Sequence, residues 1–314
     1  MEVITGIENV HRSFKSPVLT IGNFDGVHRG HQALFRKLKE WAAKFNGESL
    51  IMTFDPQPLE ILMPGKAPFC ITAHGRKLEL ISTFGIDVAI VIPFSKKFAQ
   101  ISARDFVVRI LVEIIGIKAI VVGYDYRFGR GREGNIDFLR KMGEQYGFEV
   151  DTISGFRMDD TVVSSTTIRQ LIRKGDLRSA SRMLGRRYEI TGLVVTGRKR
   201  GARLLGFPTA NIPVSRQSSP KTGVYAVEAE VDGKSFGGAA NLGYNPTFGD
   251  TELTLEVHLF DFNETIYGKP LTVRFVDRLR DEKRFGSIEE LSAQIRMDIE
   301  KAKEILAAGV SASM

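Results

Sequence analysis

The stretch Gly22–His31 reads Gly-Asn-Phe-Asp-Gly-Val-His-Arg-Gly-His. It follows a short apolar run at Val18 to Ile21 and precedes an amphipathic helical pattern. A strand, a glycine-rich turn and a helix start in this order predict a nucleotide site, because unpaired backbone N–H groups there attract phosphate. His28 and His31 share one face of the helix and can neutralise charge that develops on a triphosphate.

A histidine at a helix start can also be a cap or a solvated side chain. Two of the five histidines of the chain lie in this one turn, which favours the catalytic interpretation. The segments that follow alternate between strand and helix. A helix from about Gly30 to Phe45 places apolar residues on one stripe. Strand-like runs occur at Val18 to Phe24, Leu50 to Phe54, Val88 to Ile92, Ala119 to Val122 and Glu149 to Ile153.

This alternation predicts an α/β domain with a doubly wound parallel sheet, whose ligands bind outside the carboxyl ends of the strands. The pattern changes after about Gly185 to closely spaced strands, which predict a small antiparallel β-barrel. We therefore expect domains at 1–184 and 185–314. The barrel strands are expected at Glu189 to Thr196, Tyr225 to Val231, Phe236 to Leu242, Leu253 to Phe260 and Leu271 to Val276.

A final helix is expected to begin at Ser287, with Glu290 completing a capping box. Its apolar stripe should pack on the barrel; the stripe comprises Ile288, Leu291, Ile295, Ile299, Ala302 and Leu306.

The composition is that of a globular protein with two cores: 314 residues, 43% hydrophobic and 26% charged. The single cysteine, Cys70, cannot form an intramolecular disulfide, which points to a reducing compartment. The net charge of +7 is dispersed, and its densest cluster, Arg198-Lys199-Arg200, suits small anionic substrates as well as a polynucleotide. There is neither a leader-like start nor a membrane-length apolar run, so we expect a cytoplasmic protein that binds no membrane.

Two further segments should converge on the histidine turn. The segment 123–129 follows an apolar strand, and it could border a flat ring through its aromatic residues, with Asp125 or Arg127 as hydrogen-bonding groups; an ordinary surface loop is the alternative. The segment 164–169 opens a helix with hydroxyl groups and Arg169, which suit a phosphate or simply cap the helix.

Together these motifs resemble the nucleotidyltransferase module of bacterial FAD synthetases, which transfers the adenylyl group of ATP to FMN and releases pyrophosphate. The resemblance implies catalytic roles for His28 and His31 at the triphosphate. It implies ATP or phosphate binding by Gly22, Asn23, Phe24, Gly26, Gly30, Ser164, Ser165, Thr166 and Arg169. It implies that Asp125, Tyr126, Arg127 and Phe128 border the flavin. A phosphate oxygen of FMN can attack the α-phosphorus directly, so positioning and charge stabilisation carry the catalysis.

In the second half, the segment 206–211 reads Gly-Phe-Pro-Thr-Ala-Asn. In an extended chain Thr209 and Asn211 project from one face, and their neutral oxygens suit Mg²⁺ that is shared with ATP. Closing a turn is the alternative role. Upstream, the segment 197–201 offers backbone N–H groups and cations for phosphates, through Gly197, Arg198 and Gly201.

With the segments 241–249 and 255–258, this half resembles riboflavin kinase, a small antiparallel barrel. The resemblance implies that Thr209 and Asn211 bind Mg²⁺, that Asn245 contacts flavin, and that Glu256 is the general base for the ribityl hydroxyl. A strand glutamate that is merely solvated is the alternative. Over about Val18 to Leu306 the chain is similar to the bacterial bifunctional riboflavin kinase/FAD synthetases. It departs from them at Gln57, where the family usually has histidine, which removes a titratable group near the first site.

The expected partners are therefore riboflavin, FMN and ATP, without nucleic acid, and the oligomeric state is left open. Two other functions also remain open. One is a nucleotidyltransferase for another phosphorylated acceptor, with the barrel as an appendage. The other is a flavin- or nucleic-acid-binding module without turnover; the usual stacking signatures of RNA-binding modules are missing from the sequence.

Overall fold

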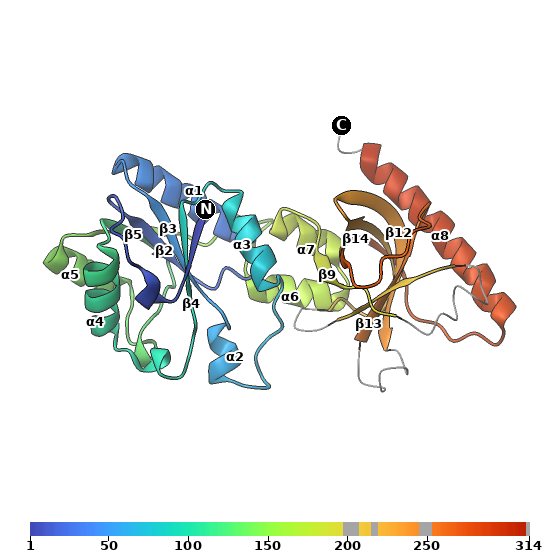
Figure 1. The fold of residues 1–314 in the computed structure, drawn as a ribbon, viewed down its shortest axis with the longest axis horizontal. Helices are drawn as coiled ribbons and strands as arrows, with labels where there is room; N and C mark the ends of the chain where they lie inside the picture. The colour runs from blue at the N-terminus through green and yellow to red at the C-terminus, as the bar shows by residue number, and fades with distance from the viewer. Residues whose placement is uncertain (197–206, 215–218, 245–252, 312–314) are drawn as a thin grey trace. The chain divides into compact units, whose positions relative to one another are not determined.

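The protein is described by a computed structural model over residues 1–196, 207–214, 219–244 and 253–311. The chain forms two compact units (Figure 1): Met1–Phe69 with His74–Ser165, and Cys70–Ala73 with Thr166–Met314. The helices α6 (Ser165–Lys174) and α7 (Leu177–Leu184) thereby group with the second unit, although the sequence was expected to divide after residue 184. The position of the domain boundary remains a prediction.

The first unit contains a six-stranded sheet in the order β1-β4-β3-β2-β5-β6, and every pairing in it is parallel. The predicted doubly wound parallel sheet is therefore confirmed. The sequence interpretation missed the first strand, which is short and has only one buried residue. The strands are β1 (Glu2–Thr5), β2 (Val18–Ile21), β3 (Ser49–Phe54), β4 (Val88–Ile92), β5 (Ala119–Gly123) and β6 (Glu149–Ile153).

Two apolar clusters cover the two faces of this sheet, because successive strand residues point to opposite sides. Ile51 packs with Phe35 and Ile81 of α1 (Arg29–Lys44) and α3 (His74–Ser82). Leu50 and Met52 belong to the cluster that contains η3 (Phe106–Ile115) and α5 (Ile136–Tyr146). The smaller elements are η1 (Ile7–Asn9), α2 (Pro58–Leu62), η2 (Phe98–Gln100), α4 (Ala103–Asp105), η4 (Arg130–Arg132), β7 (Arg157–Met158) and β8 (Thr161–Val162).

The strand order reverses direction at β2, which pairs with β3 on one side and with β5 on the other. Ligands of such sheets bind at this point, outside the carboxyl ends of the strands. The predicted strand from Val18 to Phe24 is too long, since β2 ends at Ile21. The chain then turns sharply, and Phe24 takes a positive φ of 51° that no strand accommodates.

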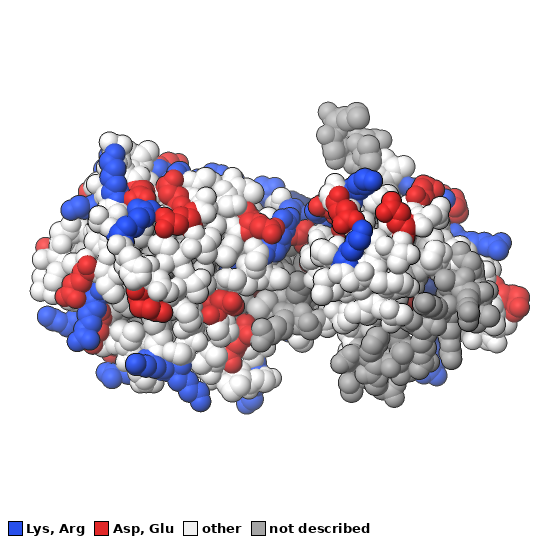
Figure 2. All heavy atoms as spheres, in the orientation of Figure 1, with Lys and Arg blue, Asp and Glu red and all other residues white. Residues whose placement is uncertain are grey.

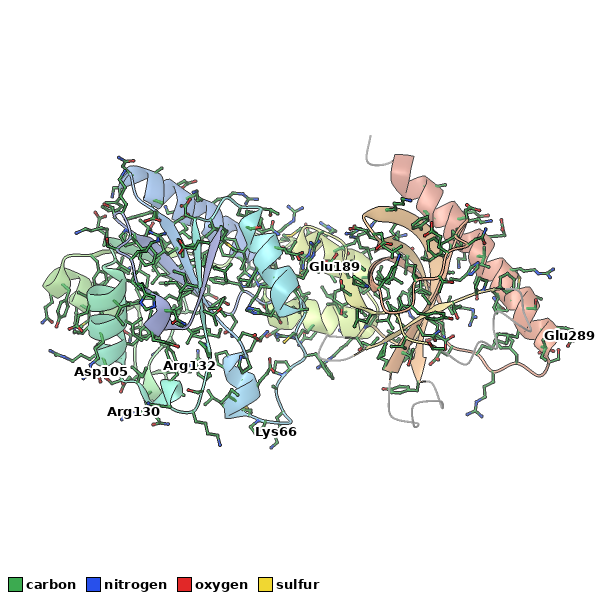
Figure 3. The ribbon with its side chains drawn as sticks, viewed as in Figure 1. Lys66, Asp105, Arg130, Arg132, Glu189 and Glu289 are labelled. Carbon is green, nitrogen blue, oxygen red and sulfur yellow. The ribbon has the colours of Figure 1, made fainter. Side chains whose placement is uncertain are left out.

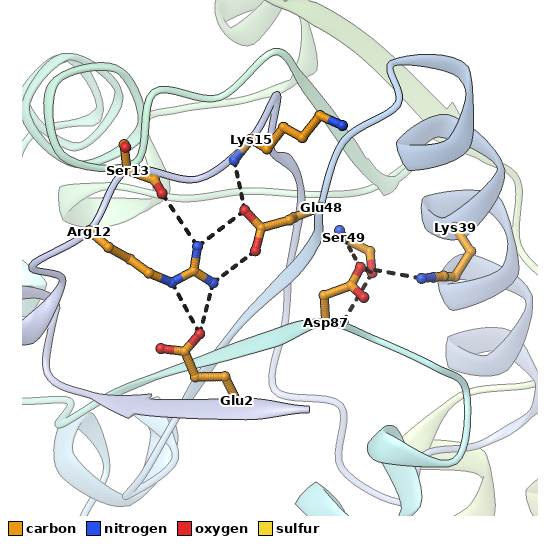
Figure 4. A network of polar contacts seen from close by, with 8 residues as sticks. All are labelled: Glu2, Arg12, Ser13, Lys15, Lys39, Glu48, Ser49 and Asp87. Carbon is orange, nitrogen blue, oxygen red and sulfur yellow. Dashed lines mark hydrogen bonds and ion pairs between the residues drawn. The ribbon is translucent and has the colours of Figure 1, made fainter.

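A polar network joins the amino ends of the strands, at the opposite edge of the sheet (Figure 4). Arg12 donates hydrogen bonds to Glu2 and to Glu48, each at 2.8 Å. Asp87 accepts hydrogen bonds from the hydroxyl group of Ser49 at 2.5 Å and from its backbone N–H at 2.8 Å. These contacts link the starts of β1, β3 and β4, so they stabilise the sheet at the edge away from the turn after β2.

The second unit contains an antiparallel six-stranded sheet in the order β10-β13-β12-β11-β14-β9. A bridge between Val195 and Asn211 links its two edges, so the sheet forms a nearly closed barrel, as expected. The extra strand β10 lies where the sequence indicated only an extended segment. The barrel strands are β9 (Glu189–Leu193), β10 (Ala210–Pro213), β11 (Gly223–Val231), β12 (Lys234–Tyr244), β13 (Leu253–Leu259) and β14 (Pro270–Arg280).

The helix α8 (Ile288–Ser311) packs on this barrel through Ile299 and Ala302, which lie in one apolar cluster with Val224 and Ala239. Its start differs slightly from the expected capping box. The hydroxyl group of Ser287 accepts from the N–H of Glu290 at 3.2 Å, as expected, but the Glu290 carboxylate accepts from Gly286 at 3.0 Å, one residue earlier. At the start of the stripe Ile288 is 52% exposed.

Charged side chains are interspersed on the face of the molecule drawn in Figure 2, where lysine and arginine alternate with aspartate and glutamate. Among the helices that the structure describes, none has both the length and the apolar character that crossing a membrane requires.

Candidate functional site: two sites on two units

The turn after β2 is a strained segment whose side chains lie in the core. Positive φ angles occur at Phe24 (51°), Gly26 (88°) and Val27 (43°), and the last is unusual for a β-branched residue. Phe24 and Val27 are 2% and 1% exposed and pack beneath α1. Burial of these two side chains holds the backbone in this conformation, so the turn is a rigid support for the residues that follow.

His28 and His31 form a stacked pair at the start of α1. Their ring centroids are 3.5 Å apart and the planes differ by 19°. His28 is the N-cap, and its Nδ1 accepts a hydrogen bond from the backbone N–H of His31 at 3.3 Å. Because Nδ1 accepts, the proton of the neutral His28 ring lies on Nε2, which can donate to a phosphate oxygen. A Cβ at Gly30 would lie 3.2 Å from the Cε1 and Nδ1 atoms of this ring, so a larger residue there would press on the His28 ring.

The environment of His31 keeps its imidazole neutral. Burial lowers the pKa of His31 well below its ordinary value, and the nearby His28 and Lys77 lower that pKa further. The edge of its ring contacts Phe24 at a centroid distance of 5.4 Å. Within the described parts of the chain, His31 Nδ1 is buried and has no hydrogen-bond partner. The histidine pair can therefore offer hydrogen-bond donors and ring dipoles to a ligand, and His31 adds no positive charge of its own.

Ser165, in one of the two segments that were expected to converge on the histidine turn, contacts that turn. The hydroxyl group of Ser165, the first residue of α6, donates to the backbone carbonyl of Asp25 at 2.9 Å. Ser164 is half-buried, whereas Thr166 is exposed and Arg169 is half-buried one turn further on. The hydroxyl group of Ser165 thus lies against the glycine-rich turn.

The segment 123–129 begins at the end of β5, the strand beside β2. Asp125 and Arg127 are exposed, and Tyr126 is half-buried. The Tyr126 ring stacks on Phe128 at 5.5 Å and 15°. Phe128 itself is 8% exposed and packs in the core against Phe106. The polar groups of this segment and one face of its aromatic pair are therefore better placed for a ligand than Phe128 is.

The short helix η4 follows this segment, and Figure 3 labels two of its side chains, Arg130 and Arg132. Both are exposed. Gly129 precedes them with a φ of 74°, and a Cβ there would lie 2.7 Å from the backbone nitrogen of Ala103, so only glycine fits.

Sequence reasoning missed a buried lysine beside the histidine turn. Lys77 of α3 is 2% exposed, and its Nζ donates to the Thr53 hydroxyl at 3.1 Å and to the Asn23 carbonyl at 3.3 Å. Its position four residues before the buried Ile81 places both side chains on the same helix face, which was the available signal. Gln57, by contrast, is the N-cap of α2, where its backbone N–H donates to Glu60 at 3.4 Å.

The second site lies on the barrel, where three polar residues stand side by side. Asn211 of β10 pairs with Glu256 of β13, and Glu256 pairs with Asn241 of β12. Directly opposed residues of antiparallel strands project from the same face, so these three side chains neighbour one another. Asn211 is 6% exposed and Glu256 is half-buried.

A cavity of about 600 Å³ opens over these strands. Thr209, Asn241 and Glu256 line it on the barrel side, and Leu291 and Ile295 of α8 line it on the other. A volume of this size accommodates a cofactor-sized ligand. The cavity therefore combines an apolar wall with the Glu256 carboxylate and the neutral oxygen donors of Thr209 and Asn241, and Glu282 and Asp298 also line it.

Further residues of this cavity were not singled out from the sequence. His258, two residues after Glu256 on the same strand face, forms a 2.9 Å hydrogen bond with the Pro208 carbonyl. Its ring lies edge-on to Phe207 at 5.6 Å. The Arg280–Asp298 ion pair also borders the cavity, with a shortest distance of 2.7 Å. The alternation of side chains along a strand could have indicated His258. The ion pair joins residues 18 positions apart, so only the folded structure reveals it.

Several predicted site residues fall outside the described residues: Gly197, Arg198, Gly201 and Asn245. Within residues 1–196, 207–214, 219–244 and 253–311, no three His, Cys, Asp or Glu side chains gather as metal ligands.

Comparison with known proteins matches the two units to two family models. The model described as FAD synthetase matches residues 11–167, and the model described as riboflavin kinase matches residues 184–306. A crystal structure described as a macrolide-efflux protein from Streptococcus pneumoniae superposes with a TM-score of 0.85 at 32% identity, covering 95% of this chain and 97% of that one.

Three curated relatives carry the same name, bifunctional riboflavin kinase/FMN adenylyltransferase. The protein of Escherichia coli K12 is 42% identical over 306 residues, which is 97% of each chain. That of Pseudomonas fluorescens is 41% identical over 98% of each chain, and that of Haemophilus influenzae is 40% identical over 96% of this chain and 98% of its own. Both units and nearly the full length are matched in the same order, so this chain belongs to the family of bifunctional riboflavin kinase/FMN adenylyltransferases.

Proposed function

We propose that this transferase carries out its two reactions at two separate sites: FMN is adenylylated at the histidine turn, and riboflavin is phosphorylated in the barrel cavity. Membership of the family supplies the two activities, riboflavin kinase and FMN adenylyltransferase, with ATP as the co-substrate. The assignment of residues to these reactions is the proposal.

In adenylyl transfer, a phosphate oxygen of FMN attacks the α-phosphorus of ATP, and the bond to the β-phosphate oxygen breaks to release pyrophosphate. His28 donates from Nε2 to the triphosphate, and the neutral His31 stacks on it and holds its orientation. N–H groups of the turn and of the start of α1 stabilise the charge that develops. The phosphate-binding set comprises Gly22, Asn23, Phe24, Gly26, Gly30, Ser164, Ser165, Thr166 and Arg169.

The flavin of FMN would border the segment 123–129, with Asp125 and Arg127 as hydrogen-bonding groups and Tyr126 as the aromatic surface. Phe128 would act beneath Tyr126, because it packs in the core. A rigid turn and a fixed imidazole pair favour reaction mainly by positioning the phosphates, since a reaction of bound partners avoids the entropy cost of bringing them together.

In the kinase reaction, Glu256 accepts the proton of the terminal ribityl hydroxyl as that oxygen attacks the γ-phosphorus of ATP and ADP leaves. Thr209 and Asn211 would hold Mg²⁺, whose hard-ion chemistry fits their neutral oxygen donors. When bound, Mg²⁺ neutralises charge on the phosphates of ATP. Asn245 near the flavin and Gly197, Arg198 and Gly201 near the phosphates are included on family resemblance alone.

One observation carries the assignment of the kinase reaction: Glu256 and Thr209 come from different segments of the barrel and line the same cavity. A carboxylate beside an apolar space of this size can reach a hydroxyl of a bound flavin, whereas a carboxylate on an outer strand face cannot. The apolar wall that α8 contributes suits the isoalloxazine ring.

The test uses the full-length chain and assays both reactions. Glu256→Gln keeps the shape of the side chain and removes the base, so we expect FMN formation to fall by at least about 100-fold while FAD formation from supplied FMN persists. The pair His28→Ala with His31→Ala should do the converse. Glu304→Gln, on an exposed position of α8, is the matched control. Equal loss of both activities in either variant contradicts the separation of the sites.

We also propose a cytoplasmic enzyme that acts on small molecules and binds neither nucleic acid nor membranes. A sequence with a single cysteine, Cys70, suits a reducing compartment. The interspersed charges in Figure 2 suit small anionic substrates. A boundary after residue 184 remains our proposal for the domains, and the riboflavin kinase model that begins at residue 184 supports it.

A further inference from the structure

Lys77 is a cation in the interior of the first unit. It lies on α3, its residue is 2% exposed, and its Nζ reaches the edge of the sheet where β2 and β3 end. Lysine is rarely buried to this degree, because removing an ammonium group from water is costly. The other buried residue of α3, Ile81, is apolar.

The contacts of Lys77 join two segments that are far apart in the sequence. Nζ donates to the carbonyl of Asn23 at 3.3 Å, in the turn before the histidines. It also donates to the Thr53 hydroxyl at 3.1 Å and to the Phe54 carbonyl at 3.4 Å, both at the end of β3. The Thr53 hydroxyl in turn donates to the Asn23 carbonyl at 3.3 Å. The turn is thus fixed to β3 through one ammonium group and one hydroxyl group.

We propose that Lys77 is a positioning residue for adenylyl transfer, which holds the turn 22–28 against the end of β3 and places a positive charge near the His31 imidazole. The proposal rests on the proposed function of the histidine turn. Lys77 would then contribute positive charge to the triphosphate site without touching the reacting atoms. Through Asn23 it also fixes the backbone that leads to His28.

The positive charge of Lys77 affects the protonation of the neighbouring histidines. Lys77 and His28 both lower the pKa of His31, in addition to burial. Lys77 also lowers the pKa of His74, where burial is the larger cause and Asp55 opposes it. His31 can therefore stay neutral, while Lys77 supplies a positive charge nearby. A pair of protonated imidazoles stacked at 3.5 Å would repel each other.

The experiment compares three variants in the full-length chain. Lys77→Met removes the charge and keeps the length of the side chain, and Lys77→Arg restores a charge in a larger group. Thr53→Val removes the bridging hydroxyl and keeps the charge. Lys141→Met, at an exposed position of α5, is the matched control. Each variant is assayed for FAD formation from FMN and for FMN formation from riboflavin, and the pKa of His31 is measured by NMR of histidine-labelled protein.

We expect Lys77→Met to lower kcat for FAD formation about 100-fold, the loss that misplacement by about 1 Å can cause, with riboflavin kinase activity unchanged. The pKa of His31 should rise, because a positive neighbour is removed. Lys77→Arg should recover part of kcat. Thr53→Val should lower kcat about tenfold and leave the pKa of His31 unchanged, since the ammonium group remains.

The proposal is overturned if folded Lys77→Met forms FAD within twofold of the parent rate, or if both activities fall in proportion. If Lys77→Met does not fold, Thr53→Val decides, and an unchanged kcat in that variant rejects the positioning role. Failure of the underlying assignment is distinguishable: the His28→Ala and His31→Ala pair would then keep FAD formation, whatever the Lys77 variants do.

Discussion

Replacing Asp298 by asparagine removes the charge that faces Arg280 between β14 and α8. The guanidinium group donates to the Asp298 carboxylate from Nε at 3.0 Å and from a terminal nitrogen at 2.7 Å. Gln294 donates to the same carboxylate at 3.0 Å. The side chain of Asp298 is 8% exposed, so water can barely replace these contacts. The substitution therefore leaves a partly buried cation without its counter-charge.

Breaking a fully buried pair by removing one partner costs about 3–5 kcal/mol. Arg280 keeps 23% exposure and also donates to the Asp281 carbonyl at 2.9 Å, so we expect Asp298→Asn to lower the free energy of unfolding by less than this range, about 2 kcal/mol. Glu300→Gln on the same helix is the control. Glu300 pairs with Lys303 at 3.2 Å, but the side chains are 70% and 52% exposed. Glu300→Gln should therefore lower the free energy of unfolding by no more than about 0.5 kcal/mol.

Urea unfolding separates the two units. The chain has a single tryptophan, Trp41 in α1, whose fluorescence follows the first unit, whereas circular dichroism follows both. We expect Asp298→Asn to move the barrel transition in circular dichroism by about 1 M urea and to leave the Trp41 transition in place. The KM for riboflavin should also rise, because both partners line the cavity. Equal transitions for Asp298→Asn and Glu300→Gln would refute the reasoning.

Three further outcomes are expected. Gly30→Ala should lower FAD formation several-fold without loss of stability, because its Cβ would press on the His28 ring at 3.2 Å; an unchanged rate counts against a fixed ring. The pKa of His31 is lower in the folded chain than in the unfolded chain, so below about pH 6.5 the unfolded chain binds more protons. The free energy of unfolding, followed by Trp41 fluorescence, should therefore be constant above that pH and fall as the pH drops below it. A His31→Gln variant should show a flatter dependence on pH. Thr209→Val should raise the Mg²⁺ concentration needed for half-maximal FMN formation and leave FAD formation unaffected; a parallel rise in both would argue against a barrel ligand.

Much of the fold was predictable because apolar residues recur with different periods in helices and in strands. Apolar strands separated by amphipathic helices indicated the parallel sheet, and short strands without helices indicated the barrel, and both are confirmed. β1 was missed because only Ile4 of its four residues is buried. The end of β2 was placed too late because Phe24 is apolar, yet its ring reaches the core from a turn with positive φ. Apolar pattern alone does not reveal a backbone conformation of this kind.

The candidate sites were predictable where residues are close in sequence. The three-residue spacing of His28 and His31 predicted that both side chains lie on one helix face, and in the structure their rings are stacked. Contacts between distant segments were beyond the sequence. Lys77 reaches the turn across 54 positions, and Arg280 meets Asp298 across 18. Such contacts depend on which helix covers which strand, and a single chain carries no local signal for that.

We propose that two different phosphorus atoms of ATP react at two separate sites of this chain. The most direct measurement incubates the purified chain with riboflavin, Mg²⁺ and ATP radiolabelled at either the γ- or the α-phosphorus, and separates the flavins over time. We expect γ-label in FMN first and then in FAD, and α-label in FAD alone. Glu256→Gln should abolish both labels from riboflavin and still incorporate α-label from supplied FMN. Incorporation of α-label into FMN, or no labelled flavin at all, would contradict the account.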